Sequence, residues 1–241
     1  MKRLGIVFAV LVAAVLAFNI MFPSATVRFR LTLDADIDGK PATGSGVIEV
    51  SYMARPRLLP NEAEFSINVR GEAVALALGQ RGTLFVLLKS AEDSRSGAEW
   101  IVLRAFNFPG GALPFPVAKG VSDVRQLSGK VELPLRSVPL LVRFRDINDP
   151  LTVEKVDPLL LEKSFGPGVQ LTHATLEIVP AGIWPLSWYG ITGESITNRL
   201  EKQLVWLKAT KGGYLDGNFA GGGPKLSNIL HGGDFKTGLG R

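Results

Sequence analysis

Cysteine is absent from this sequence of 241 residues. Its absence excludes disulfides, zinc sites built on thiolates, cysteine nucleophiles and a lipid-modified cysteine anchor. An oxidising compartment is still compatible with the chain, because 46% of its residues are hydrophobic and a large core needs no covalent cross-links. The 27 glycines and 15 prolines indicate a folded domain that is rich in turns.

Catalytic motifs are also scarce. Histidine occurs only as His173 and His231, which are too far apart in the sequence to form a metal-binding pattern. There is no G-x-S-x-G elbow, and GGGPK at Gly221–Lys225 lacks the spacing of a phosphate-binding loop. We therefore predict no catalytic residue, no cofactor and no enzymatic activity. A hydrolase that uses two carboxylates from distant parts of the sequence is the alternative.

The basic residues are not clustered. The formal net charge is +5, and Lys2 and Arg3 supply two of these charges. The other lysines and arginines alternate with aspartates and glutamates. Because a nucleic-acid-binding surface needs clustered positive charge, we expect no nucleic-acid partner.

The N-terminus contains an apolar run, Leu4–Phe22, interrupted only by Gly5 and Asn19. In a helix this run would span roughly 28 Å, close to the thickness of a bilayer's hydrocarbon core. No A-x-A cleavage site stands at its end, which favours an uncleaved transmembrane anchor over a cleaved signal peptide. We expect residues 4–22 to cross a bacterial inner membrane once.

The orientation in that membrane follows from charge and length. Lys2 and Arg3 favour a cytoplasmic N-terminus, although Arg28, Arg30 and Lys40 lie close on the other side of the run. The short N-terminal segment and the large domain that follows favour export of the rest. We therefore predict a periplasmic location, in the bacterial envelope, for most of the chain.

After Pro23 the hydrophobic pattern has a period of two residues. Apolar side chains alternate with polar ones from Val27 to Ile37, as expected for a half-buried strand. Asp38-Gly39 is a favoured hairpin turn, and a second strand is predicted over Ser45–Met53.

The same segment contains three aspartates with the spacing that opens a calcium loop. Asp34, Asp36 and Asp38 precede Gly39, but position twelve is Ser45 rather than a bidentate glutamate, and both flanks are predicted strands. We therefore interpret the aspartates as the polar face of a strand. A calcium site at these three residues is the weaker alternative, since a cation would relieve their mutual repulsion.

Further strands are predicted at a spacing of about ten residues, with Gly/Pro/Asp turns between them. They cover 64–69, 72–78, 83–89, 100–106, 130–135, 140–144 and 169–179. Short helices are predicted over 158–164, after the cap residue Asp157, and over 194–208. The fold class is thus mainly β: an antiparallel sandwich- or barrel-like domain at residues 24–210, after the anchor at 1–23.

Two loops, 106–120 and 180–193, are unusually apolar. They are expected to cap the ends of the core, or to contact a membrane surface or a ligand. Trp184, Trp188 and Tyr189 in the second loop are weak candidates for a small-ligand site.

The tail, residues 211–241, is rich in glycine and cannot build a core of its own. It is predicted to be either a flexible terminus or a segment that becomes ordered on a protein partner. Tyr214, Phe219, His231 and Phe235 are weak candidates for that docking contact.

Several motifs from about Leu141 onward resemble a family of uncharacterised bacterial proteins that join a hydrophobic N-terminus to a β-rich domain. They are DINDP at Asp146–Pro150, VDP at Val156–Pro158, FGPGV at Phe165–Val169 and EKQLVWL at Glu201–Leu207. TGSGVIEV at Thr43–Val50 and LSNILHGGDF at Leu226–Phe235 are similar to the family as well. The resemblance implies a bacterial origin and a C-terminal half that forms one unit. It implies no activity and no catalytic residue.

The sequence thus predicts a membrane-anchored binding or interaction protein of the bacterial envelope. A small-ligand-binding module that uses loop 180–193 and a carboxylate-based hydrolase are the alternatives. The oligomeric state is not indicated by any pattern.

Overall fold

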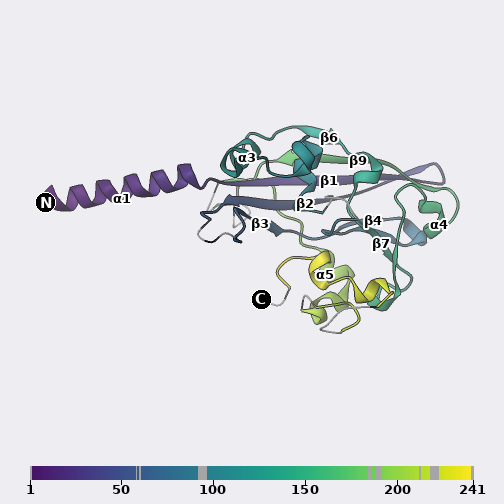
Figure 1. Ribbon diagram of the computed structural model, residues 1–241. Helices are drawn as coiled ribbons and strands as arrows, with labels where there is room; N and C mark the ends of the chain where they lie inside the picture. Colours follow the sequence, from purple (N-terminus) through teal and green to yellow (C-terminus); the bar gives the residue numbers. More distant parts are fainter. Residues whose placement is uncertain are drawn as a thin grey trace.

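The computed structural model describes residues 2–57, 59, 61–91, 97–183, 186–187, 191–211, 213–217 and 223–239. Helix α1 (Lys2–Met21) extends from one end of a β-rich domain, as Figure 1 shows. Within α1, the described side chains are those of residues 7, 11–13 and 15–21. Among the residues that the structure describes, no helix combines the length and the apolar character needed to cross a membrane.

The domain contains two antiparallel sheets. The first has the order β3 (Phe65–Arg70), β2 (Lys40–Ala54), β1 (Ser24–Ile37), β9 (Val169–Val179) and β6 (Lys130–Glu132). The second has the order β4 (Val74–Ala77), β5 (Thr83–Val86), β7 (Leu141–Phe144) and β8 (Val153–Lys155). The predicted mainly β, antiparallel fold is confirmed.

The hairpin β1–β2 is the longest strand pair and follows the predicted pattern. Its turn consists of Asp38 and Gly39, both with positive φ, at 53° and 80°. Such a turn matches the right-handed twist of the two strands. The odd-numbered apolar residues from Val27 to Ala35 are all buried, so the period of two residues correctly indicated the buried face.

The remaining elements are short. The α-helices are α2 (Ile101–Ala105), α3 (Val117–Val124), α4 (Leu161–Phe165), α5 (Leu200–Gln203) and α6 (Gly232–Phe235). The 3-10 helices are η1 (Gly79–Arg81), η2 (Pro109–Gly111), η3 (Leu135–Ser137), η4 (Pro150–Thr152), η5 (Val205–Thr210) and η6 (Leu226–Asn228).

Two hydrophobic clusters lie on the two faces of the second sheet. Leu84 and Val86 of β5 belong to the main cluster, which also contains the apolar face of the first sheet and parts of α2 and α3. Phe85 and the following Leu87 belong to the second cluster. Because successive side chains of a strand point to opposite faces, the second sheet is buried on both sides.

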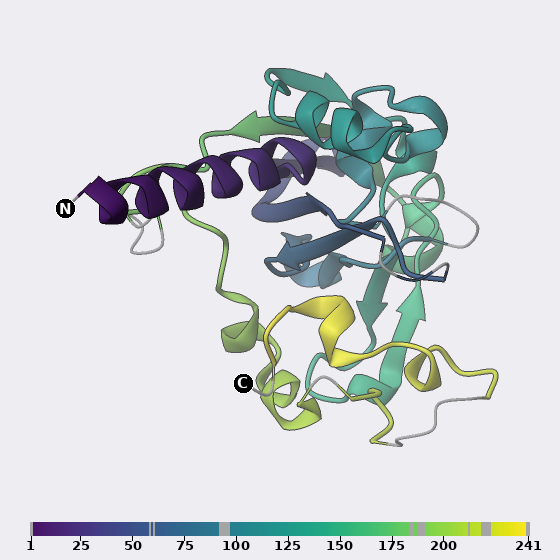
Figure 2. The same ribbon diagram turned by 60° about the vertical axis from the view of Figure 1, so that its left-hand side comes forward.

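The second cluster is completed by the C-terminal segment. Its members from that segment are Leu200, Leu204, Leu207, Leu215, Leu230 and Phe235. Figures 1 and 2 show this segment as a layer on the side of the second sheet that faces away from the first. The described part of the tail therefore supplies apolar side chains to the hydrophobic cluster on the outer face of the second sheet.

Two local predictions are wrong. The predicted strand 100–106 is helix α2, because a helical turn buries the consecutive residues 101–103 and leaves Arg104 exposed. The apolar loop 106–120 runs into helix α3, whose Val117, Val121 and Val124 are buried at helical spacing. Gly120 obscured this pattern; it lies against Pro114, and a Cβ atom there would stand 2.7 Å from the proline Cδ.

The predicted helices are shorter than expected. The helix predicted over 158–164 begins only at Leu161, because the Asp157 carboxylate accepts a hydrogen bond from Leu159 N and forms a turn first. In the segment 194–208, residues 194–198 are not helical and are hydrogen-bonded to the first sheet. The helix starts at Leu200 and continues as a 3-10 helix after Leu204.

Candidate functional site

Three charged side chains form a row across the polar face of the first sheet. Arg28 on β1 lies opposite Glu49 on β2, and Glu49 lies opposite Arg70 on β3. Arg28 Nε donates to Glu49 Oε2 at 2.6 Å, and Arg70 Nη1 donates to Glu49 Oε1 at 2.9 Å. One carboxylate therefore holds two guanidinium groups in fixed positions.

The centre of this row is buried although it lies on the polar face. Arg28 is 4% exposed and Glu49 is 6% exposed. Residues 194–198 lie over this part of the sheet, where Glu194 contacts Arg28 on β1 and Thr197 contacts Val47 on β2. Because taking an ion pair out of water is costly, the pair needs further hydrogen bonds, and Arg28 Nη1 donates one to the Glu194 carbonyl at 2.6 Å.

The segment that covers the row is fastened at two more points. Thr197 N donates to Val47 O at 3.1 Å, and Val47 N donates to Thr197 Oγ1 at 2.8 Å. Arg30 donates to the carboxylates of Glu177 and Glu194. The hydrogen bond with Glu194, followed by the negative charges of Glu194 and Glu177, raises the pKa of the Arg30 guanidinium despite a smaller opposing effect of burial.

A cavity of about 420 Å³ lies beside the row. Its wall contains the cationic side chains of Arg28, Arg70 and Lys236, together with Ser195, Thr197 and Asn198. An adjoining cavity of about 340 Å³ shares Arg28 and Arg70 and includes Glu49. Cavities of this size hold small molecules in other proteins.

The hydrogen-bond donors of Arg28 are not all used. Its Nε and Nη1 have the partners given above, whereas Nη2 has no hydrogen-bond partner within the described residues. Among those residues, every buried side-chain nitrogen or oxygen that is shielded from solvent has a hydrogen-bond partner. Because Nη2 has no such partner, it is accessible to solvent. Since Arg28 is otherwise buried and lines both cavities, that access is through them.

Lys236 contributes positive charge to the wall but is fully paired. Its Nζ donates to Glu201 Oε1 at 2.8 Å and to Asn198 Oδ1, and it lies 3.9 Å from Glu72 Oε2. The buried Glu72 also accepts hydrogen bonds from the backbone nitrogens of Arg199 and Leu200 at the start of α5. This cluster thus attaches the C-terminal layer to the wall of the cavity.

Loop 180–193, predicted to cap the core or to contact a membrane or a ligand, has described residues at the smaller cavity. Glu194 N donates to Pro180 O at 2.8 Å and closes the loop at its base. Ala181, Gly182 and Ser187 line the cavity. The candidate residues Trp184, Trp188 and Tyr189 lie outside the described residues.

The three aspartates at the tip of the β1–β2 hairpin are engaged separately. Asp34 accepts from Thr43 Oγ1 at 2.6 Å, Asp36 accepts from Gly39 N at 2.8 Å, and Asp38 pairs with Arg81 at 3.0 Å. Within the part of the chain that the structure describes, no group of three His, Asp or Glu side chains could hold a metal ion.

The four candidate docking residues of the tail have different positions. Phe235 is fully buried and packs against Phe144 and Trp206 within the chain. Tyr214 and His231 form a ring pair with centroids 3.8 Å apart, and both are partly exposed. Phe219 lies outside the described residues.

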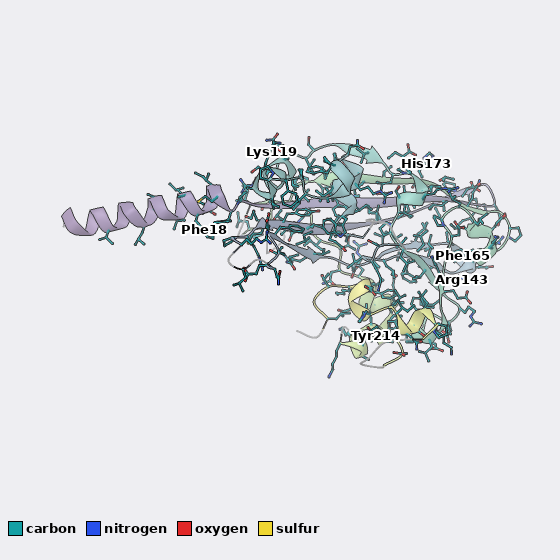
Figure 3. All side chains as sticks on the ribbon, in the orientation of Figure 1. Phe18, Lys119, Arg143, Phe165, His173 and Tyr214 are labelled. Atoms are coloured by element: carbon teal, nitrogen blue, oxygen red, sulfur yellow. The ribbon has the colours of Figure 1, made fainter. Side chains whose placement is uncertain are left out.

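The histidines do not form a shared site. Figure 3 shows His173 at the edge of the first sheet, and Tyr214, the ring partner of His231, in the C-terminal layer. His173 is exposed, and its Nδ1 lies 2.8 Å from Glu132 Oε1 on the surface. The polar side chains that line the larger cavity, as far as the structure describes them, are cations, hydroxyls and one amide, and neither histidine is among them.

Sequence reasoning did not identify Arg28, Glu49 or Arg70 as site residues. Arg28 was placed on the polar face of a predicted strand, and such positions are normally solvated. The feature that identifies these three residues is the alignment of opposite charges across three neighbouring strands. Recognising it requires the register of the strands and the position of the segment that covers them. Neither is visible in one sequence without a structure.

No protein-family model, no curated protein and no solved structure matches this chain.

Proposed function

We propose that the chain is a membrane-anchored binding protein of the bacterial envelope that takes its ligand in the cavities beside the Arg28–Glu49–Arg70 row. The single observation that carries this proposal is the accessible Nη2 of the otherwise buried Arg28 in the wall of both cavities. Because Nη2 is held in place and faces the cavities, it offers a bound molecule a donor that the fold itself does not use.

The anchor is proposed from the apolar run 4–22 and from the exposure of α1. Described side chains on all sides of this helix are exposed; they include Val7, Leu11, Val15, Phe18 and Ile20. Phe18 lies on α1 outside the domain in Figure 3. Exposed apolar surface of this extent on an isolated helix is stable when lipid covers it, which supports insertion in a membrane.

The end of the domain next to α1 suits a membrane surface. Ala54 N donates to Pro23 O at 3.0 Å, and Arg125 Nε donates to Ser24 O at 2.7 Å, so the end of β2 and the end of α3 lie where α1 stops. Two exposed apolar side chains, Leu59 and Phe115, belong to the chain just after β2 and just before α3. Exposed apolar side chains at this end of the domain suit contact with the surface of the bilayer that holds α1.

A binding role is favoured over a hydrolase by the lining of the larger cavity. Hydrolysis by two carboxylates needs an acid and a base that face the same space. The described lining of this cavity contains no carboxylate. Glu49, in the smaller cavity, is held by two arginines.

The test is a thermal-shift screen of the full chain in phosphatidylcholine nanodiscs against anionic, cationic and neutral small molecules. A variant with Ser195→Phe fills the larger cavity from its exposed rim, and Ser128→Phe on an exposed turn is the matched control. We expect at least one compound class to raise the melting temperature of the wild type and of Ser128→Phe but not of Ser195→Phe. Equal shifts in both variants would place binding elsewhere.

A further inference from the structure

We infer that the cavity beside Arg28 is an anion-binding site for a ligand that presents a phosphate or carboxylate group. This inference rests on the proposed function and names the ligand class for the same site.

The first argument is the charge of the row. Arg28 and Arg70 carry two positive charges and Glu49 carries one negative charge, so the row has a net charge of 2 − 1 = +1. The third cation of the wall, Lys236, is already balanced by Glu201 and Glu72. The charged side chains in the described wall of the larger cavity are thus all cationic, which favours an anion over a cation there.

The second argument is the direction of the charges. Glu49 lies between the two arginines, and each of its carboxylate oxygens accepts a hydrogen bond from one of them. The guanidinium groups line both cavities, and the larger cavity has no carboxylate among its described lining residues. A ligand in the larger cavity thus meets the positive part of each ion pair first.

The third argument is the supply of donors. Arg28 Nη2 is unused and is held in place by the two hydrogen bonds of Nε and Nη1. Thr197 Oγ1 accepts from Val47 N, which leaves its own proton free to donate. Ser195 makes no hydrogen bond within the described residues. A wall of oriented donors favours an anionic acceptor, and a hydrogen bond from a guanidinium nitrogen to a phosphate or carboxylate is charge-assisted.

Two sources of that anion are compatible with the position of the site. Arg28 is the fifth residue of β1, which begins at Ser24, three positions after the last residue of α1, so Arg28 lies about 13 Å along the strand from Ser24. In an anchored chain this distance allows either a soluble anion or the headgroup phosphate of a lipid to reach the cavity. The experiment separates the two sources.

The experiment measures the thermal unfolding of the full chain in nanodiscs. The probes are millimolar inorganic phosphate in phosphatidylcholine nanodiscs and, without phosphate, nanodiscs that contain phosphatidylglycerol. Sodium chloride at equal ionic strength controls for screening. Two variants lower the positive charge of the site: Arg70→Gln, and Ser195→Asp, which places a carboxylate at the rim.

Matched controls have the same changes away from the cavity. Arg145→Gln removes an exposed arginine that pairs with Glu154 on the second sheet, and Ser128→Asp adds a carboxylate on an exposed turn. We expect phosphate to raise the melting temperature of the wild type and both controls, with an apparent affinity at least about tenfold weaker in Arg70→Gln and Ser195→Asp. Stabilisation by phosphatidylglycerol alone, with the same dependence on Arg70 and Ser195, would assign the anion to a lipid headgroup.

Other outcomes overturn the inference. If neither probe stabilises the wild type, or if all four variants respond as the wild type does, the cavity does not bind anions. If a neutral or cationic compound stabilises the wild type but not Ser195→Phe, the binding function stands and only the ligand class is wrong. If no compound of any class acts through Ser195, the proposed function fails as well.

Discussion

Arg28 and Glu49 lie directly opposite each other on neighbouring strands, and both are buried on the face of the sheet that its sequence marks as polar. Their ion pair is covered by residues 194–198, which come from a part of the chain more than 140 positions later than Glu49 in the printed sequence. The pair thus joins the N-terminal hairpin to the segment that leads into the C-terminal layer.

The first prediction concerns this pair. Glu49→Gln leaves two arginines without their shared carboxylate, and removing one partner of a buried ion pair costs about 3–5 kcal/mol. Urea unfolding should therefore show a large loss of stability. Glu132→Gln is the control, because Glu132 pairs with His173 on the surface of the same sheet and an exposed pair contributes about 0–1 kcal/mol. Equal effects of both substitutions would contradict the buried row.

The second prediction concerns the tail. Phe235 is completely buried in the second cluster, so Phe235→Ala should destabilise the chain by about 3–5 kcal/mol. Ile229 lies in the same segment but is 46% exposed, and Ile229→Ala should cost much less. A chain that ends at residue 210 loses Leu215, Leu230 and Phe235 together and should not unfold in a single sharp transition. If Phe235→Ala left the free energy of unfolding in denaturant unchanged, the packing of the C-terminal layer on the second sheet would be contradicted.

The third prediction concerns alkaline pH. Burial, together with the nearby charge of Glu99, raises the pKa of Tyr52 well above its ordinary value, and its hydroxyl donates to the Glu99 carbonyl at 2.8 Å. Because the folded-state pKa is the higher one, the stabilisation is complete below the unfolded pKa of about 10 and is lost as the pH rises toward the folded pKa.

Tyrosinate absorbance measures this effect. Of the three tyrosines in the chain, Tyr52 should ionise only together with unfolding. Tyr52→Phe should remove the part of the absorbance increase that appears only when the chain unfolds at high pH. It should also lower the free energy of unfolding by about 1 kcal/mol at neutral pH, through the lost hydrogen bond. A Tyr52 that titrates in the folded chain near its ordinary pKa would disagree with its burial.

The fourth prediction concerns acid. Hydrogen bonds from Lys236 and Lys208 lower the pKa of Glu201. A lowered folded-state pKa stabilises the chain at pH values above the unfolded pKa of about 4.3, and this stabilisation is lost as the pH falls through the folded value. Glu201→Gln should therefore reduce the acid dependence of the melting temperature. Glu62→Gln, on an exposed turn, serves as the comparison, and identical acid profiles for Glu201→Gln and the wild type would count against this contact.

The elements that the sequence predicted best are those with one buried face. Strand β1 alternates along most of its length, and β9 covers Val169–Val179 as predicted, although its alternation shifts by one residue between Leu171 and Ala174, where its register with β1 also shifts. Helices α2 and α3 were missed because their short apolar runs are ambiguous and contain Gly120 next to a proline-rich loop. The site was missed because it depends on three strands in register and on a distant covering segment.

The tail illustrates the same limit. Its glycines correctly indicated that it has no core of its own, but not that Leu230 and Phe235 complete the open face of another sheet. The composition of the tail shows that it cannot form a core alone, but the positions of its apolar residues depend on packing against a sheet from a distant part of the chain.

The chain has no cysteine, which allows the central claim to be tested with one engineered thiol. Ser195→Cys places it at the rim of the larger cavity, and Ser128→Cys is the control away from the cavity. The measurement is the rate at which a membrane-impermeant maleimide modifies each variant in intact bacterial spheroplasts, with and without millimolar phosphate. The account predicts modification of both variants from outside and a slower rate only for Ser195→Cys when phosphate is present. Modification that requires a permeabilised membrane, or that is equally fast with and without phosphate at both positions, would contradict it.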